Sequence, residues 1–191
     1  MRKFDPQAFG PAVAELLPVD LLCPLGPGSP QRAFGPRLQE LDENGLLGGR
    51  VAADREMTRC CLAGLWLVHD FLDESHRISQ TLPTTSGSYW HGIMHRREPD
   101  FANAKYWFQR VGDHPIFPGL CAAANELAGQ STGQPAARFL VEQPRWDPMR
   151  FVDLCESVAR GRSSSGELCR QIAQVEWWLL FEHCYQRALG P

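Results

Sequence analysis

The sequence predicts an all-α fold, built as a single-domain helical bundle. The chain has 191 residues, the usual size of one domain, and 43% of them are hydrophobic, which is enough for a core. β-branched residues are scarce, with 9 Val, 4 Ile and 5 Thr, whereas Leu and Ala are abundant. Because this composition disfavours a large sheet and favours helices, we expect one helical domain over residues 1–191.

Residues 1–50 are predicted to form a Pro/Gly-rich arm that wraps over a bundle body at 51–191. Seven of the fifteen prolines lie in the first 36 residues. Asp5-Pro6 is typical of a helix N-cap followed by proline, so a short helix is expected through about Leu17, stopped by Pro18. Residues 23–30 hold too many Pro and Gly for a helix or central strand and should be extended. A second short helix is expected over 36–41, before Asn44-Gly45 and Gly48-Gly49 break it.

The first long helix of the body should run from about Ala52 to Gln80. Pro83 and the polar loop at 84–87 end it, and a second helix should run from about Ser88 to the residue before Pro99. Gly112 ends a third helix over 101–111. Shorter helices are expected over 120–128 and 136–142. Asp147-Pro148 repeats the cap-plus-proline pattern and begins a helix to Ala159, and after a loop at 163–166 the last helix runs over 167–189.

Composition also limits the cellular context and the partners. The chain carries 19 Lys+Arg against 22 Asp+Glu, a formal charge of −3, which argues against a nucleic-acid binder. No apolar run approaches the roughly 18 residues of a membrane span, and residues 1–6 lack the apolar stretch of a signal peptide. We therefore expect a soluble, cytoplasmic protein with no nucleic-acid or membrane partner, and homo-oligomerisation stays open.

The seven cysteines predict neither a disulfide framework nor a zinc ribbon. Their number is odd, no CxxC pair is present, and most of them lie where a helix would bury them. We expect structural thiols.

The chemistry is concentrated between residues 66 and 114, which hold five of the six histidines. On a helix, positions i, i+4 and i+7 share one face. The first long helix then presents a stripe of two imidazoles and a carboxylate, and the second helix presents a matching one. The stripes are His69, Asp73 and His76, and His91, His95 and Glu98.

The short loop between these two helices predicts antiparallel neighbours, so the stripes should face each other. Two His and a carboxylate form a common ligand set for a divalent metal such as Zn, Fe or Mn. All six stripe residues are candidate ligands, and the four histidines are also candidate acid–base groups. Two alternatives stay open: a metal-free pocket, and a buried structural network in which Arg96 and Arg97 neutralise Glu98 and Asp100.

The segment from Trp90 to Trp107 has the form WHxIMHRRExDxxNxxYW. It resembles a motif of uncharacterised bacterial and fungal proteins, and the resemblance covers about residues 62–115. The resemblance marks a family and implies no established activity.

Other residues of the same region suggest a pocket for an anionic small molecule. Four cations could clamp a carboxylate or phosphate, namely Arg96, Arg97, Lys105 and Arg110. Three aromatic residues, Trp90, Tyr106 and Trp107, could flank a flat or sugar-like ligand. The sequence therefore favours a small-molecule enzyme, although catalysis itself stays undecided. The alternative is a non-catalytic ligand-binding or interaction protein whose His/Arg/acid cluster is a structural network.

Overall fold

The computed structural model describes residues 4–17, 23–131 and 135–190, and within them every regular element is a helix. The predicted all-α fold is confirmed. Two 3₁₀ helices, η1 and η2, accompany the α-helices. The elements are η1 (Pro6–Phe9), α1 (Pro11–Ala14), α2 (Gly35–Glu40), α3 (Glu43–Leu46), α4 (Arg55–Val68), α5 (Leu72–Ser79), α6 (Thr85–Arg97), α7 (Phe101–Val111), α8 (Phe117–Gln130), η2 (Pro135–Ala137), α9 (Phe139–Glu142), α10 (Pro148–Ala159) and α11 (Gly166–Leu189).

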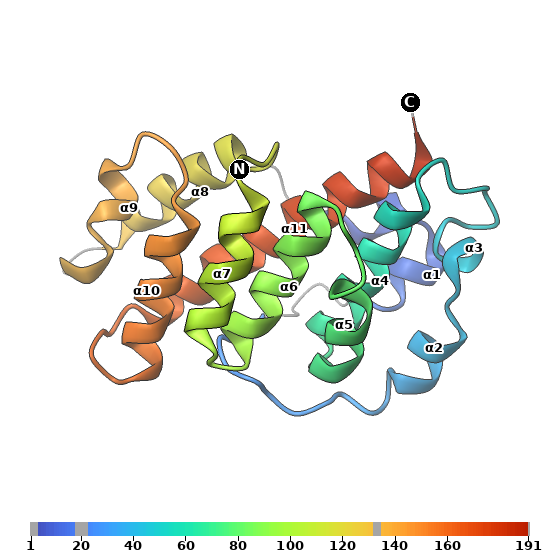
Figure 1. Cartoon of the computed structure of the whole chain (residues 1–191), viewed down its shortest axis with the longest axis horizontal. Coiled ribbons are helices and arrows are strands. Elements are labelled where there is room, and N and C mark those ends of the chain that lie inside the picture. The colour runs from blue at the N-terminus through green and yellow to red at the C-terminus, as the bar shows by residue number, and fades with distance from the viewer. Residues whose placement is uncertain (1–3, 18–22, 132–134, 191) are drawn as a thin grey trace.

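The helices pack around a central pair, α6 and α7 (Figure 1). On one side of this pair lie α5 and α4, and on the other side lies α10. The long helix α11 passes behind them and packs against α4, α8 and α10. One hydrophobic cluster extends through these elements and includes residues of the N-terminal segment such as Phe9 and Val13. The helices therefore share a single core.

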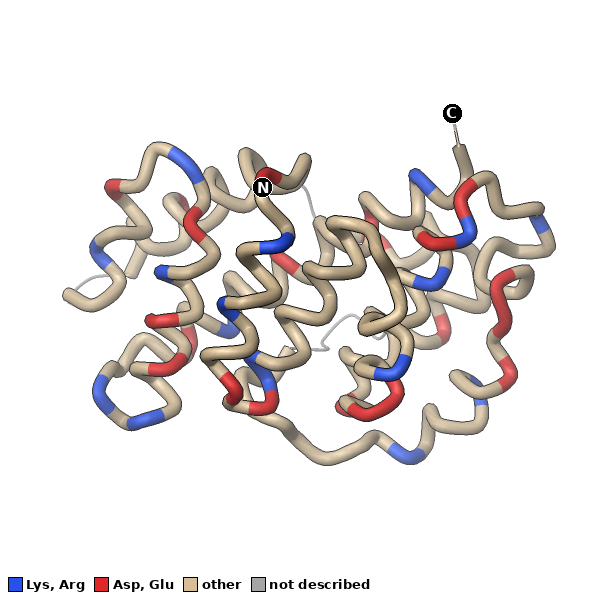
Figure 2. The backbone as a smooth tube through the Cα atoms, in the orientation of Figure 1, with Lys and Arg blue, Asp and Glu red and all other residues tan. Residues whose placement is uncertain are grey.

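Charged residues of both signs are interspersed along the described chain (Figure 2). None of the described helices is both long and apolar enough to cross a membrane.

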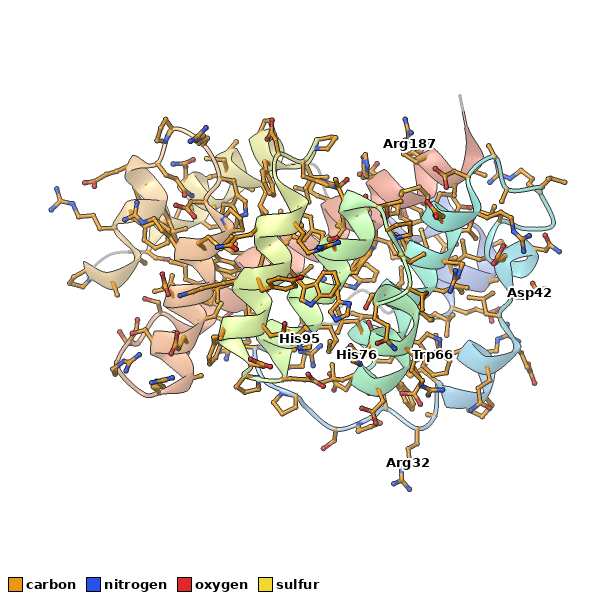
Figure 3. All side chains as sticks on the ribbon, in the orientation of Figure 1. Arg32, Asp42, Trp66, His76, His95 and Arg187 are labelled. Carbon is orange, nitrogen blue, oxygen red and sulfur yellow. The ribbon has the colours of Figure 1, made fainter. Side chains whose placement is uncertain are left out.

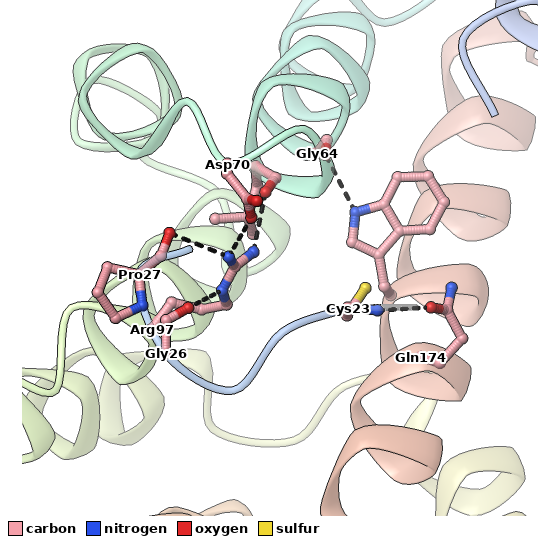
Figure 4. Close-up of polar contacts among 9 residues, drawn as sticks. Cys23, Gly26, Pro27, Gly64, Asp70, Arg97 and Gln174 are labelled. Carbon is pink, nitrogen blue, oxygen red and sulfur yellow. Dashed lines mark hydrogen bonds and ion pairs between the residues drawn. The ribbon is translucent and has the colours of Figure 1, made fainter. Parts of the chain in front are cut away.

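Residues 23–34 cross one edge of the helical layer, and Arg97 holds this segment there (Figures 1 and 4). The Arg97 guanidinium donates to the carbonyls of Gly26 (2.9 Å) and Pro27 (3.3 Å) in that segment. It also donates to the Leu67 carbonyl (2.9 Å) and pairs with the Asp70 carboxylate. Nearer the start of the same segment, the Cys23 N–H donates to the side-chain oxygen of Gln174 in α11 (2.9 Å). The predicted stop at Pro18 lies outside the described residues.

The prediction of one helix over 52–80 is wrong, because the chain bends between α4 and α5. Asp70 adopts a left-handed backbone (φ 65°), which ends α4 and redirects the chain. Its carboxylate pairs with Arg97, and the His69 carbonyl accepts from the Gln31 N–H (3.0 Å). No Gly or Pro marks this bend in the sequence, so long-range contacts stabilise a backbone that local propensity disfavours.

Other boundaries differ in smaller ways. α6 begins three residues earlier than predicted, because the Thr84 side chain accepts from the Gly87 N–H and caps the helix. α3 forms where Asn44-Gly45 was expected to break the chain, since Asp42 caps it. α8 also extends beyond the predicted 120–128 at both ends. The helices predicted over 101–111, 147–159 and 167–189 are confirmed to within one residue.

Helix α6 is buried over almost its entire length, from Ser86 to Arg97. Its close approach to α4 depends on Gly64, where a Cβ atom would lie 2.8 Å from the Trp90 ring. On another side the Arg96 guanidinium pairs with Glu176 of α11 and lies 4.8 Å from the Phe151 ring centroid. The Tyr89 hydroxyl donates to the same carboxylate (3.1 Å). Burial lowers the pKa of Arg96, but Glu176 outweighs this effect and the pKa is raised.

We expect the Arg96→Met variant to lose about 3–5 kcal/mol of unfolding free energy, because it leaves the Glu176 carboxylate buried without its cation. Urea unfolding followed by circular dichroism measures this loss. Arg110→Gln, at an exposed position, serves as the control and should change stability by no more than about 0.5 kcal/mol. A loss below about 1 kcal/mol for Arg96→Met would show that the ion pair does not stabilise the core.

Candidate metal centre

Three of the predicted histidines converge between α5 and α6. One ring nitrogen from each of His76, His91 and His95 lies within 4.8 Å of the others. His91 and His95 are one turn apart on α6, and both are buried, with 2% and 6% exposure. His76 comes from the last turn of α5 and is half-buried. Figure 3 shows His76 and His95 close together in the middle of the molecule.

Local structure explains why these side chains meet. A short loop at 80–84 joins α5 to α6, and the two helices pack against each other. His76 and His95 both belong to the last turn of their helices. The carbonyl ends of helices favour positive charge, so this position suits a cation.

The hydrogen bonds assign the protons of the buried pair. The Glu98 carboxylate lies 3.3 Å from His95 Nδ1, which therefore carries a proton and donates to it. His95 Nε2 then accepts a hydrogen bond from the Nε2–H group of His91, across 2.9 Å. This arrangement leaves His91 Nδ1 buried without a hydrogen-bond partner.

Helix α7 covers the other side of the cluster. The Trp107 ring stacks on the His91 imidazole, with centroids 4.0 Å apart and planes inclined by 16°. The Asn103 side-chain nitrogen lies 3.1 Å from His95 Nε2. The packing fixes the orientation of the His91 ring, because Trp107 lies against its face.

Burial keeps the His91 and His95 imidazoles neutral at pH 7. Burial, together with the neighbouring His95 and His76, lowers the pKa of His91 to about 3, while the Ser79 backbone opposes part of the shift. Burial also lowers the pKa of His95, against the opposing effect of Glu98. Neutral imidazoles offer lone pairs to a metal without first losing a proton.

The geometry fits a metal ion. Two imidazoles on a tetrahedral zinc ion, at about 2.0–2.1 Å each, place their nitrogens roughly 3.3–3.4 Å apart. The 2.9 Å separation in the structure is close to this value. The cluster therefore has the donor set of a three-histidine site, with its three ring nitrogens within 4.8 Å of one another.

Two other predicted ligands lie away from the cluster. His69 ends α4; its Nε2 donates to the Leu16 carbonyl (2.7 Å) and its ring stacks on Phe34. Asp73 is exposed on α5. Both were placed on one stripe with His76 by assuming a continuous helix. The bend at Asp70 separates His69 from His76, whereas Asp73 shares α5 with His76 but is exposed in its first turn. Glu98 contacts a histidine and is positioned to orient it.

The predicted substrate-binding residues are dispersed. Arg96 and Arg97 are buried and paired with Glu176 and Asp70. The others are separate from these pairs: Lys105 pairs with Asp153, Trp90 packs in the core against Trp177, and Arg110 lies beside Tyr106 and Trp107 at the surface. Sequence reasoning assigned no role to Asn103, although it lies within the motif, because its contact with His95 depends on how α7 packs.

Comparison with known proteins adds no relative: no protein-family model, curated protein or solved structure matches this chain.

The lowered pKa values predict acid-sensitive folding. Burial and His183 lower the pKa of His114 to about 4, so His91 and His114 are both neutral in the native state. An unfolded histidine titrates near 6.5, so the unfolded chain binds more protons below that pH. Stability should be complete above about pH 6.5 and should fall as the pH decreases towards 4.

Urea midpoints measured at pH 7 and pH 5 test this dependence in the wild type and in His91→Gln. The variant lacks one buried imidazole, so its midpoint should fall less between the two pH values. Gln109→Ala, an exposed change on α7, should retain the wild-type dependence. Equal losses in His91→Gln and the wild type would contradict the assignment.

Proposed function

We propose that this chain is a small-molecule enzyme that binds one divalent metal ion through His76, His91 and His95. The observation that supports this proposal is the convergence of three imidazole nitrogens within 4.8 Å, two of them on buried side chains. Three neutral imidazoles favour zinc or iron over manganese, which prefers carboxylate oxygens. The ion would supply Lewis-acid activation of a water molecule or a substrate oxygen at the position that the protein leaves open.

The chain's own residues would hold and orient this site. Glu98 accepts the Nδ1 proton of His95 and thereby directs Nε2 towards the cluster. Trp107 shields one face of His91 from water. Arg96 and Arg97 are used inside the fold, so recognition of an anionic substrate depends on the metal charge and on α7.

A non-catalytic role is the second candidate. It is favoured by the direct contact between His91 and His95 at 2.9 Å, since two buried imidazoles that bond each other also form a structural network. A folded protein that binds no metal would support this candidate.

Calorimetric titration of tag-free protein with zinc distinguishes the two candidates. We expect one zinc ion per chain, and a loss of affinity of at least about 100-fold in His76→Ala, which removes a ligand from a half-buried position. Glu98→Gln should weaken binding by about 10-fold, because it removes the carboxylate that orients His95.

His69→Ala is the matched control, since its ring lies outside the cluster and zinc affinity should not change. Circular dichroism confirms that each variant is folded. Absence of zinc binding by the folded wild type, or unchanged affinity in His76→Ala, would refute the metal site.

A further inference from the structure

One face of α7 borders the histidine cluster through residues at i, i+4 and i+7, namely Asn103, Trp107 and Arg110. Asn103 contacts His95, and Trp107 stacks on His91. The Arg110 guanidinium lies over Trp107, with its carbon 5.3 Å from the ring centroid. The polar group of this face nearest to the cluster is therefore the Asn103 amide.

The Asn103 amide carries two N–H groups, and His95 can accept a hydrogen bond from only one of them. The Asn103 nitrogen lies within hydrogen-bond distance of His95, 3.1 Å from Nε2 and 3.4 Å from Nδ1. Within the described part of the chain, the carbonyl oxygen of this amide has no hydrogen-bond partner. Asn103 is half-buried, and its main-chain N–H is fixed by Asp100 at the start of α7. The amide is thus held beside the cluster with hydrogen-bonding capacity to spare.

We infer that Asn103 recognises a small carboxylate ligand at the open position of the metal centre, by donating a hydrogen bond from Nδ2 to a carboxylate oxygen. This inference rests on the proposed metal site. A metal bound to His95 Nε2 would lie about 2.0–2.1 Å from that nitrogen, and the Asn103 nitrogen lies 3.1 Å from the same atom. A ligand oxygen beside the metal would therefore lie next to the amide.

The charge of the site selects an anion. The imidazole ligands carry no charge, so only the nearby carboxylates Glu98 and Asp100 would offset the charge of a divalent ion. The buried cations Arg96 and Arg97 are paired elsewhere, so the metal and a neutral amide donor would bind the carboxylate together. An amide placed where negative charge gathers on oxygen is a common means of electrostatic stabilisation.

Cobalt(II) and acetate are suitable probes, because cobalt reports its coordination through visible absorption. The tag-free wild type is loaded with Co²⁺ and then titrated with sodium acetate at constant ionic strength. We expect the absorption to change in a saturable manner. Asn103→Ala should bind acetate about 10-fold more weakly while its Co²⁺ affinity stays within about 2-fold of the wild type. Asn103→Asp should lose more acetate affinity, because a second negative charge faces the ligand.

Gln109→Ala, an exposed change on another face of α7, is the control, and its acetate affinity should stay within about 2-fold of the wild type. Unchanged acetate affinity in Asn103→Ala, or an equal loss in Gln109→Ala, would overturn the role of Asn103 and leave the metal site intact. If Co²⁺ binds the wild type saturably but acetate does not change its absorption, the role of Asn103 is likewise overturned and the metal site stays intact. Failure of the wild type to bind Co²⁺ would instead refute the proposed function itself.

Discussion

The burial of α6 is the constraint on which the rest of the structure depends. Residues 86–97 of this helix are all buried, yet they include three charged or titratable side chains near its C-terminal end, His95, Arg96 and Arg97. Buried polar groups are costly unless they are paired, and the two arginines find their partners on other segments. Arg96 requires Glu176 of α11, and Arg97 requires both Asp70 and the carbonyls of the N-terminal segment. The packing of α11, the bend after α4 and the course of the N-terminal segment thus follow from the polar groups of one helix.

Burial of α6 affects its arginines and its histidines in opposite ways. The arginines retain their charge because carboxylates lie against them, and they stabilise the fold. The histidines lose their charge because burial and mutual proximity lower their pKa values, and they remain available as ligands. Adjacent residues of α6 point in different directions by about 100°, so His95 and Arg96 can serve different purposes.

Helix α7 contacts the two histidines of α6, whereas neither of the two arginines forms its ion pair with α7. It lies against α6 and places an aromatic ring on His91 and an amide beside His95. The cluster is therefore bordered by half-buried side chains on both sides, Asn103 and Trp107 of α7 and His76 of α5.

The sequence by itself determined the helical class, several helix boundaries and the region of interest. Scarce β-branched residues, capping pairs such as Asp147-Pro148, and the i, i+4 spacing of His91 and His95 are local signals, and local signals can be interpreted without a structure. The tertiary structure decided which of the marked residues meet. His69 left the cluster because Asp70 adopts a left-handed backbone that Arg97 stabilises from 27 residues away. Arg96 left the presumed substrate pocket because Glu176, 80 residues away in the chain, lies against it. Asn103 gained its position only when α7 packed against α6. Each of these outcomes depends on contacts between distant segments, and helical periodicity carries no information about such contacts.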